Sequence, residues 1–462
     1  MFVGRQFELA ELNRLYDTNE FQFVVVYGRR RVGKTTLLME FCRGKPTIFH
    51  VADETVGSVA LERFSRDVFQ HFGLKGVSSF RSWEDAFEFL AEKARSERLV
   101  LVIDEFQHVA NACKELPSVL QRCIDLKFKK TKLFLILCGS YVSFMEKEVL
   151  GYESPLYGRR TAQFEINPLS FLEAKEFFPK YSIEQRVVAY AILGGTPQYL
   201  ETFSDEVDPL ENVRLHVLRK SSYLYEEPLF LLRQELREPK VYNSILEAIA
   251  SGRTRLNEIS TKIGVEVVKL SKYLDTLMGL KLIERVSPFP LGKSAREGLY
   301  RIKDNFFKFW YRFVFPNREL IEQGLADKVL EEKLRPHIGE YVGRVFEDIA
   351  VQYLWELNKK GALPFRFERI GKWWGNNPIK RRQEEVDVVA YDEENVLLCE
   401  CKWQNKPVGL KEVNELMERG SLFDFKRKYY VFFSKAGFSE EVLDLAKSYP
   451  LILIALDRMD SP

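Results

Sequence analysis

The sequence predicts an α/β protein of several domains, the first of which is built on a parallel sheet. At 462 residues the chain is too long for one hydrophobic core, so several domains are expected. Continuous apolar runs, typical of strands buried on both faces, occur at residues 21–27, 99–103 and 133–138. Each run ends in a glycine-containing or acidic segment, and open α/β sheets bind their ligands at such strand ends.

The first run leads into a segment whose composition suits a triphosphate: Gly28-Arg29-Arg30-Arg31-Val32-Gly33-Lys34-Thr35, followed by Thr36 in a predicted helix. Gly28 and Gly33 let the backbone curl so that its N–H groups point at the phosphates, and the helix start adds partial positive charge. Lys34 can reach the β- and γ-phosphates, and the Thr35 hydroxyl can ligate Mg²⁺. Three arginines inside the loop also favour an anionic ligand over a chance strand–turn–helix. The loop is predicted to bind a nucleotide.

The second run ends in Asp104 and Glu105, two adjacent carboxylates at the expected ligand-binding edge of the sheet. The alternative is an acidic helix cap after a core strand. The third run is followed by Gly139 and Ser140. An ordinary serine at the turn after a strand is one interpretation of Ser140. Together with the loop, the two carboxylates make nucleotide hydrolysis credible.

Composition limits the classes of protein that the chain can represent. It is 46% hydrophobic, carries a net charge of only +2, and has six cysteines without CxxC spacing. Such cysteines suggest reduced thiols in a cytosolic setting. No run of apolar residues is long enough to span a membrane, and the first residues do not resemble a signal peptide. A cytoplasmic protein without a membrane partner is expected.

The opening segment Phe2-Val3-Gly4-Arg5 precedes a short amphipathic helix and then the arginine-rich loop. In this arrangement residues 1–230 resemble the AAA+-like and STAND-like ATPases, and in particular the archaeal ATPase family. The resemblance implies ATP and Mg²⁺ as cofactors, with Gly4 and Arg5 packing over the adenine. It also implies that Gly194-Gly195-Thr196-Pro197 marks a helical lid close to the nucleotide, although glycine and proline there also suit ordinary helix termination.

The same resemblance assigns roles to residues after the loop. Asp104 would hold Mg²⁺ through water, and Glu105 would polarise the attacking water. Ser140 would occupy the sensor position that reports on the γ-phosphate. Arg159 and Arg160 are candidates for an arginine finger acting in cis or from a neighbouring subunit, so a homo-oligomer is left open. A solvated surface patch is the alternative for the two arginines.

Residues 241–302 show the pattern of a winged helix-turn-helix. Helices are expected at 241–250, 256–263 and 265–278, followed by strands at 280–286 and 299–302. The third helix would present Lys269, Ser271 and Lys272 outward, and the wing loop would carry Lys293 and Arg296. Contact with DNA and a purely structural packing role are both open.

The last part of the chain carries a second set of charged residues. A helix at 340–358 holds Glu347, and a basic, Trp-containing loop at 366–382 suits phosphate contact and base stacking. A strand at 385–390 with Asp387 then precedes a strand at 396–402 with Glu400 and Lys402. Side chains alternate along a strand, so Glu400 and Lys402 share a face, which Asp387 on the paired strand can meet.

These residues resemble the PD-(D/E)xK nuclease fold in the form fused to archaeal ATPases, known as DUF234. The resemblance implies that Asp387 and Glu400 ligate Mg²⁺, that Lys402 orients or deprotonates the attacking water, and that Glu347 adds a ligand or positions Lys402. Val386 stands where that fold usually has proline. The alternative is a surface ion-pair cluster on a hairpin.

The resulting architecture is a P-loop NTPase parallel sheet with helical lid, a winged helix-turn-helix, and a C-terminal restriction-endonuclease-like α/β domain. The expected boundaries are a P-loop core at 1–165, a lid at 166–235, a winged helix at 236–305, a linker at 306–336 and a nuclease-like domain at 337–462. The chain is expected to couple ATP hydrolysis to DNA binding or metal-dependent DNA cleavage. A non-nucleolytic STAND-like switch that binds DNA or protein, and an ATPase without a DNA role, are the alternatives.

Overall fold

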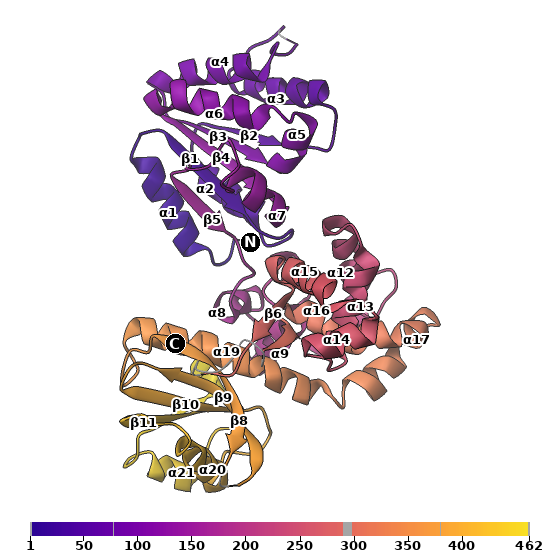
Figure 1. Ribbon diagram of the computed structural model, residues 1–462, viewed down its shortest axis with the longest axis vertical. Coiled ribbons are helices and arrows are strands. Elements are labelled where there is room, and N and C mark those ends of the chain that lie inside the picture. Colours follow the sequence, from indigo (N-terminus) through magenta and orange to yellow (C-terminus); the bar gives the residue numbers. More distant parts are fainter. Residues whose placement is uncertain (1, 77, 290–297, 379, 461–462) are drawn as a thin grey trace. The chain divides into compact units, whose positions relative to one another are not determined.

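The computed structural model describes residues 2–76, 78–289, 298–378 and 380–460. It contains two compact units (Figure 1). The N-terminal unit comprises Met1–Pro168 with Thr196–Gln198, and the C-terminal unit comprises Leu169–Gly195 with Tyr199–Pro462. Each unit is described by itself. No helix among the described residues combines the length and the apolar character needed to cross a membrane.

The N-terminal unit has a five-stranded sheet in the order β2-β3-β4-β1-β5, with every neighbouring pair parallel. The three apolar runs form β1, β3 and β4, and every residue of these strands is buried, as expected for strands covered on both faces. Its strands are β1 (Gln22–Tyr27), β2 (Thr47–Val51), β3 (Leu99–Asp104), β4 (Leu133–Gly139) and β5 (Ala162–Glu165). The predicted parallel sheet is confirmed.

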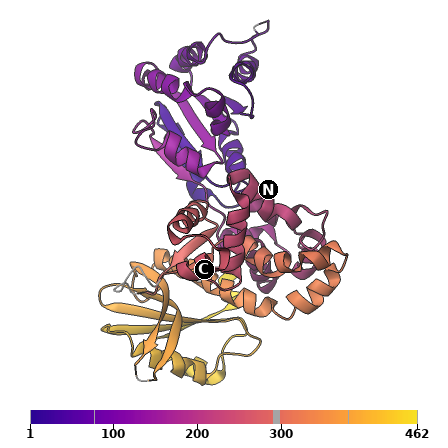
Figure 2. The same cartoon turned by 45° about the vertical axis from the view of Figure 1, so that its right-hand side comes forward.

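Helices cover both faces of this sheet (Figures 1 and 2). One apolar layer joins β1, β3 and β4 to α3, α4, α5 and α6, and a second joins alternate residues of the same strands to α1 and α2. The helices are α1 (Gln6–Asp17), α2 (Lys34–Cys42), α3 (Gly57–His71), α4 (Trp83–Ser96), α5 (Phe106–Ala112), α6 (Leu116–Leu126) and α7 (Val142–Phe144).

The C-terminal unit begins with helices and continues with the winged-helix pattern. Its first helices are α8 (Phe171–Ala174), α9 (Ile183–Leu193), α11 (Pro209–His216) and α12 (Tyr223–Glu235). The short helix α10 (Pro197–Leu200) is divided between the units, because Pro197 and Gln198 belong to the N-terminal unit and Tyr199 and Leu200 to the C-terminal unit. Three helices and an antiparallel hairpin follow: α13 (Pro239–Ala250), α14 (Leu256–Ile263), α15 (Val267–Gly279), β6 (Ile283–Val286) and β7 (Leu299–Ile302). This is the element order that the sequence predicts for residues 241–302.

The stretch at 306–336, expected to be a linker, is helical and packed. It contains α16 (Asn305–Phe309), α17 (Arg318–Glu322) and α18 (Ala326–Lys328), joined by short 3₁₀ and π turns. Phe306, Phe309 and Trp310 are fully buried. The linker expectation is therefore wrong, because large aromatic side chains contribute too much apolar area to be left in a solvated connection.

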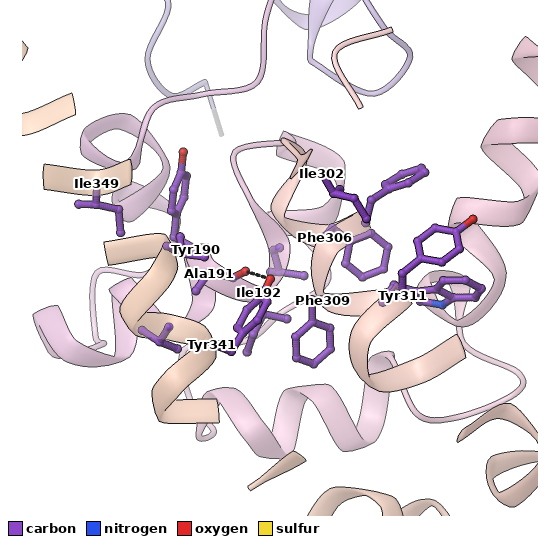
Figure 3. Packing of buried hydrophobic residues seen from close by; sticks show 14 of the residues in the cluster. Tyr190, Ala191, Ile192, Ile302, Phe306, Phe309, Tyr311, Tyr341 and Ile349 are labelled. Atoms are coloured by element: carbon purple, nitrogen blue, oxygen red, sulfur yellow. Dashed lines mark hydrogen bonds between the residues drawn. The ribbon is translucent and has the colours of Figure 1, made fainter. Parts of the chain in front are cut away.

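The centre of this core joins α16 to α9 and to α19 (Ile338–Lys360) (Figure 3). Tyr341 points toward α9, and its hydroxyl donates to the carbonyl oxygens of Ala191 and Asn305, each at 2.9 Å. The ring of Tyr341 meets Phe309 edge-on at 5.8 Å between centroids. A buried tyrosine is stable here because its hydroxyl finds partners while its ring packs.

The last part of the chain folds into a second five-stranded sheet, ordered β12-β11-β10-β9-β8, with α19 on one face and α20 and α21 on the other (Figures 1 and 2). Strands β8, β9 and β10 are antiparallel, whereas β10, β11 and β12 are parallel. The elements are β8 (Arg369–Asn377), β9 (Arg382–Tyr391), β10 (Asn395–Lys402), α20 (Leu410–Gly420), β11 (Arg427–Ser434), α21 (Glu440–Leu445) and β12 (Leu451–Ala455).

Strand β8 corrects the expectation of a basic loop at 366–382. Trp373 lies 5.0 Å from the ring of Phe423 and belongs to the core under α20, so it is not free to stack on bases. Of the basic residues, Arg369 and Lys372 lie on this edge strand, and Lys380, in the turn after it, pairs with Glu418 at 2.5 Å. Dense charge misled the prediction because an edge strand tolerates charge on its open side.

Candidate functional site

The phosphate-binding loop closes on itself through Lys34, the first residue of α2. Its Nζ donates to the carbonyl oxygens of Gly28 at 2.8 Å and Arg29 at 3.0 Å. Gly28 has φ +152°, and a Cβ there would stand 2.2 Å from the carbonyl oxygen of Ile166, so only glycine fits. Gly33, with φ +88°, is the N-cap residue that precedes α2. The hydrogen bonds of Lys34 and the backbone conformation of Gly28 thus hold the loop in shape.

Two residues of the predicted magnesium site lie together in the N-terminal unit. The Thr35 hydroxyl donates to Asp104 Oδ2 at 2.6 Å. Thr35 is exposed, whereas the Asp104 carboxylate is buried at the end of β3. A hydroxyl beside a carboxylate is a donor set that suits Mg²⁺, so these residues fit the ion that the loop implies. Thr36, the next residue, is exposed, whereas Val32 within the loop is buried.

Glu105 is held in place by two neighbours. It adopts a left-handed backbone conformation with φ +54°, and Oε2 accepts hydrogen bonds from Ser140 Oγ at 2.6 Å and from Gln107 Nε2. Burial favours a higher pKa, but these hydrogen bonds and the charges of Lys34 and Arg30 hold the pKa of Glu105 below its usual range. The carboxylate therefore stays ionised and oriented. Nothing in the linear sequence singled out Gln107.

The N-terminal Gly4-Arg5 turn is fixed against the loop. Arg5 has φ +63°, and its Nη2 donates to the carbonyl oxygen of Val32 at 3.1 Å and to that of Asn167. Its Nη1 pairs with Glu8 at 3.3 Å. The buried guanidinium thus connects the start of the chain to the loop. The packing of Gly4 and Arg5 over adenine stays a prediction.

The loop arginines point to different partners. Arg29 Nη2 donates to Thr196 Oγ1 at 3.2 Å, so the predicted lid segment does reach the loop. Arg30 Nη2 donates to the Tyr141 hydroxyl at 3.0 Å, and its guanidinium lies 4.9 Å from the centre of that ring. Arg31 has φ +74° at the tip of the loop. Tyr141 follows Ser140, so Arg30 is tied to the predicted sensor strand.

The two finger candidates differ in their surroundings. Arg159 Nε and Nη2 both bind Asp125 Oδ2, at 2.9 and 2.7 Å, and Nη1 donates to the Pro155 carbonyl at 2.9 Å. Arg160 is half-buried, and its charge acts on Tyr27 at the end of β1. The ion pair gives Arg159 a structural role within its own unit, which favours Arg160 as the finger.

This difference can be tested by substitution. We expect Arg159→Ala to lower the free energy of unfolding by about 1 kcal/mol, because it removes a partly exposed ion pair, and to leave kcat for ATP hydrolysis within about twofold. Asp125→Asn is the matched control and should behave alike in thermal melts. Arg160→Ala should leave stability unchanged and lower kcat by about tenfold or more. A larger loss of kcat in Arg159→Ala than in Arg160→Ala would reverse the assignment.

The C-terminal unit carries the second predicted set on α19, β9 and β10. Asp387 Oδ2 accepts a hydrogen bond from the backbone N–H of Cys401 at 2.8 Å, and Lys402 Nζ lies 3.2 Å from Glu400 Oε1. Burial and the charges of Glu400 and Glu347 raise the pKa of Asp387 to about 7. Asp387 therefore shares its electrostatic surroundings with the other two predicted carboxylates.

Glu347 has a different partner from the one expected. Its Oε2 pairs with Lys372 of β8, not with Lys402, which lies against Glu400. Burial raises the pKa of Glu347, and the Lys372 charge opposes that rise. The expectation that Glu347 positions Lys402 is not met, because the strand that brings Lys372 to α19 was taken for a loop.

Glu400 borders a cavity of about 290 Å³ in the C-terminal unit. Its Oε2 is buried and accepts no hydrogen bond, although Arg419 Nη1 of α20 lies 3.0 Å away. The cavity is lined by Lys380, Arg382, Gln383, Glu384, Glu385, Glu400, Glu415 and Arg419. The Glu400 carboxylate thus already has cationic partners in Arg419 and Lys402, and a divalent cation held by Asp387 and Glu400 would compete with them. Arg419 carried no signal in the sequence.

No cluster of three or more His, Cys, Asp or Glu side chains close enough to hold a metal ion occurs among the described residues. Any cation here would therefore depend on Asp387 and Glu400, the two ligands that the sequence predicts, together with oxygen atoms from outside the chain. That coordination is typical of Mg²⁺, which keeps several waters.

The winged-helix pattern presents basic residues on α15. Lys269 and Lys272 are exposed, as expected for a helix that meets DNA. Ser271 is half-buried, and its hydroxyl donates to the carbonyl oxygen of Val267 at 3.0 Å. The wing residues Lys293 and Arg296 lie outside the described residues.

Two family models match the chain. Residues 2–203 match an ATPase domain predominantly from Archaea. Residues 310–416 match DUF234, described as Archaea bacterial proteins of unknown function. The uncharacterized protein MJECL04 of Methanocaldococcus jannaschii is 38% identical over 454 residues, which cover 96% of this chain and 97% of that protein.

Two further comparisons are with proteins described as ATP-binding or as a Walker-type ATPase. The uncharacterized ATP-binding protein MJ0423 of the same organism is 47% identical over 45 residues, 10% of this chain and 76% of that protein. Among solved structures, the Walker-type ATPase paby2304 of Pyrococcus abyssi superposes with a TM-score of 0.50 at 22% identity, covering 67% of this chain and 96% of that one. This last likeness concerns the fold.

Proposed function

This chain belongs to the archaeal ATPases that join an ATPase domain to a DUF234 domain, and we propose that its nucleotide state controls how the C-terminal unit engages and cleaves DNA. The chain is a P-loop ATPase that binds and hydrolyses ATP. The observation that carries the proposal is the presence of two separate chemical sites in one chain. One is the Lys34–Asp104–Glu105 site, and the other is the Asp387–Glu400–Lys402 site.

In the first site each residue has one task. Lys34 neutralises charge on the transferred phosphoryl group, and Thr35 with Asp104 holds Mg²⁺, which offsets the charge of the phosphates when bound. Glu105, ionised and held by Ser140, orients the attacking water and takes up its proton. The hydrogen bond between Ser140 and Glu105 supports a sensor role for Ser140, since any shift of one side chain moves the other.

A connection between nucleotide and lid is supported by the path of the chain. Thr196–Gln198 belong to the N-terminal unit, whereas the residues on both sides belong to the C-terminal unit. Arg29 of the loop donates to Thr196. A change in the loop on hydrolysis therefore acts directly on a segment that is continuous with α9.

In the second site Asp387 and Glu400 hold a divalent cation, which activates water and stabilises charge on a scissile phosphate when bound. Lys402 lies beside Glu400, where its ammonium group can orient that water. Exposed Lys269 and Lys272 on α15 supply non-specific phosphate contacts, whose strength falls as salt rises. The substrate class supported by this arrangement is a phosphodiester of DNA.

The proposal is tested with duplex, single-stranded and branched DNA, with Mg²⁺ or Mn²⁺, and with or without ATP. Wild type should cut at least one substrate, and Lys402→Ala should reduce the rate by about 100-fold or more. The exposed Lys406→Ala is the matched control and should cut normally. Cutting that depends on ATP in wild type and is lost in Lys34→Ala would support coupling of the two sites.

A second candidate is a non-nucleolytic ATP switch that only binds DNA or protein. It is favoured by the fact that Glu347 and Glu400 already have cationic partners in Lys372, Lys402 and Arg419. Absence of cutting with every substrate and metal, together with nucleotide-dependent DNA binding, would select this function.

A further inference from the structure

Lys372 is placed by an irregularity of the C-terminal sheet. The register between β8 and β9 shifts between Gly371, which pairs with Val389, and Trp373, which pairs with Val386. Lys372 therefore stands opposite two residues of β9, and one of these is Asp387. Register shifts of this kind redirect a side chain and often occur beside active sites. The shift brings a lysine to the edge of the carboxylate cluster.

The backbone of Lys372 is anchored from the winged-helix hairpin. Its carbonyl oxygen accepts a hydrogen bond from Phe289 N at 2.9 Å. The Phe289 ring packs 4.9 Å from that of Tyr391, and a Cβ at Gly371 would stand 3.0 Å from it. All four residues belong to the C-terminal unit. The backbone position of Lys372 is thus fixed by these contacts.

The side chain of Lys372 makes an ion pair with Glu347, and both side chains are only about one-fifth exposed. Neighbouring Asp348 has cations of its own, Arg301 at 3.0 Å and Lys308 at 3.8 Å. The charge of Lys372 acts on Asp348 as well as on Glu347, its ion-pair partner. The Glu347 carboxylate in turn acts on Asp387.

We propose that Lys372 is an internal counter-cation of the carboxylate site and lowers the affinity of that site for a divalent cation. The inference rests on the proposed function in taking Asp387 and Glu400 as ligands of such a cation. A positive charge on the residue that stands opposite Asp387 repels a divalent ion in a partly buried setting. It also holds the Glu347 carboxylate in an ion pair.

The consequence is a site that fills at high cation concentration, or when an anionic group displaces Lys372 from Glu347. A DNA phosphate is such a group, because it attracts an ammonium and brings further oxygen atoms for the metal. Lys372 would thereby make cation binding depend on substrate. If the ion pair between Lys372 and Glu347 is purely structural, removal of the Lys372 charge should leave the affinity for a divalent cation unchanged.

The experiment measures Mn²⁺ binding at pH 8 without nucleotide or DNA, from the electron paramagnetic resonance signal of the free ion. Every protein carries Asp104→Asn, so that the N-terminal site does not contribute. Lys372→Gln removes the charge while keeping a donor for Glu347, and it should bind Mn²⁺ at least tenfold more tightly than its parent. Lys372→Met should show the same gain, and Lys372→Arg should stay within about threefold of the parent.

Adding Asp387→Asn to Lys372→Gln should abolish the gain, which places the ion in this cluster. Equal Mn²⁺ affinity in the parent, Lys372→Gln and Lys372→Met would overturn the inference while leaving the proposed function standing. Absence of Mn²⁺ binding in all of them would overturn the inference and the metal site together. A gain in Lys372→Gln without any DNA cutting by wild type would support the inference and reject the nuclease.

Discussion

Replacement of Lys34 by alanine is expected to weaken ATP binding by about 100-fold or more and to abolish hydrolysis. Lys34 is 5% exposed and its ammonium lies against the loop carbonyls, so its charge is only partly screened by water. Loss of a charge-assisted contact to phosphate costs about 3 kcal/mol, and each 1.4 kcal/mol is about a factor of ten in affinity. Isothermal titration with a non-hydrolysable ATP analogue measures the change.

The control for this prediction concerns the loop itself. Lys34 also bonds the carbonyls of Gly28 and Arg29, so Lys34→Ala loosens the loop in the free protein, and thermal melts should show a small loss of stability. The exposed Lys114→Ala removes the same charge elsewhere in the unit and should bind ATP normally. Retention of wild-type ATP affinity in Lys34→Ala would contradict the assignment of the phosphate-binding loop.

The N-terminal sheet was predictable because its sequence signal is simple. Strands buried on both faces require long apolar runs, and β1, β3 and β4 contain such runs and are buried at every position. Parallel strands place their carboxyl ends at one edge, so the loop, Asp104 and Ser140 had to converge there. The observed contacts of Thr35 with Asp104 and of Ser140 with Glu105 follow from that geometry.

The less predictable parts depend on contacts between distant residues. Strand β8 carries charges where a buried strand would carry apolar residues, and only its pairing with β9 shows that Lys372 meets Glu347. Gln107 and Arg419 are single polar residues on helices, where local sequence favours solvent exposure. Helix packing decides which residues Gln107 and Arg419 contact, and a single polar residue in the sequence gives no information about that packing.

The two sites also differ in how much of their geometry is already present in the protein. Glu105, Ser140 and Gln107 form a closed set of hydrogen bonds around one ionised carboxylate. In the second site the like charges of Glu400 and Glu347 act on Asp387, and Glu400 is paired with Lys402 and Arg419. The first site is thus arranged for chemistry as it stands, whereas in the second a metal cation would have to compete with positive charges of the chain itself.

Replacement of Glu105 by glutamine is therefore expected to separate ATP binding from hydrolysis. Glutamine keeps the size of the side chain and can still bond Ser140, but it carries no negative charge to take up a proton from water. Loss of a positioned general base lowers rates by about 100-fold to 10 000-fold. We expect kcat for ATP hydrolysis to fall by at least about 100-fold while ATP affinity changes by less than about threefold.

Ser140→Ala tests the support of that carboxylate. It removes a 2.6 Å hydrogen bond from Glu105 Oε2 but leaves the charge and the bond from Gln107, so kcat should fall by only about tenfold. Adding Ser140→Ala to Glu105→Gln should cause little further loss, because both substitutions act on the same water. Additive losses would mean that Ser140 senses the nucleotide independently of Glu105, and an unchanged kcat in Glu105→Gln would move the role of base to another residue.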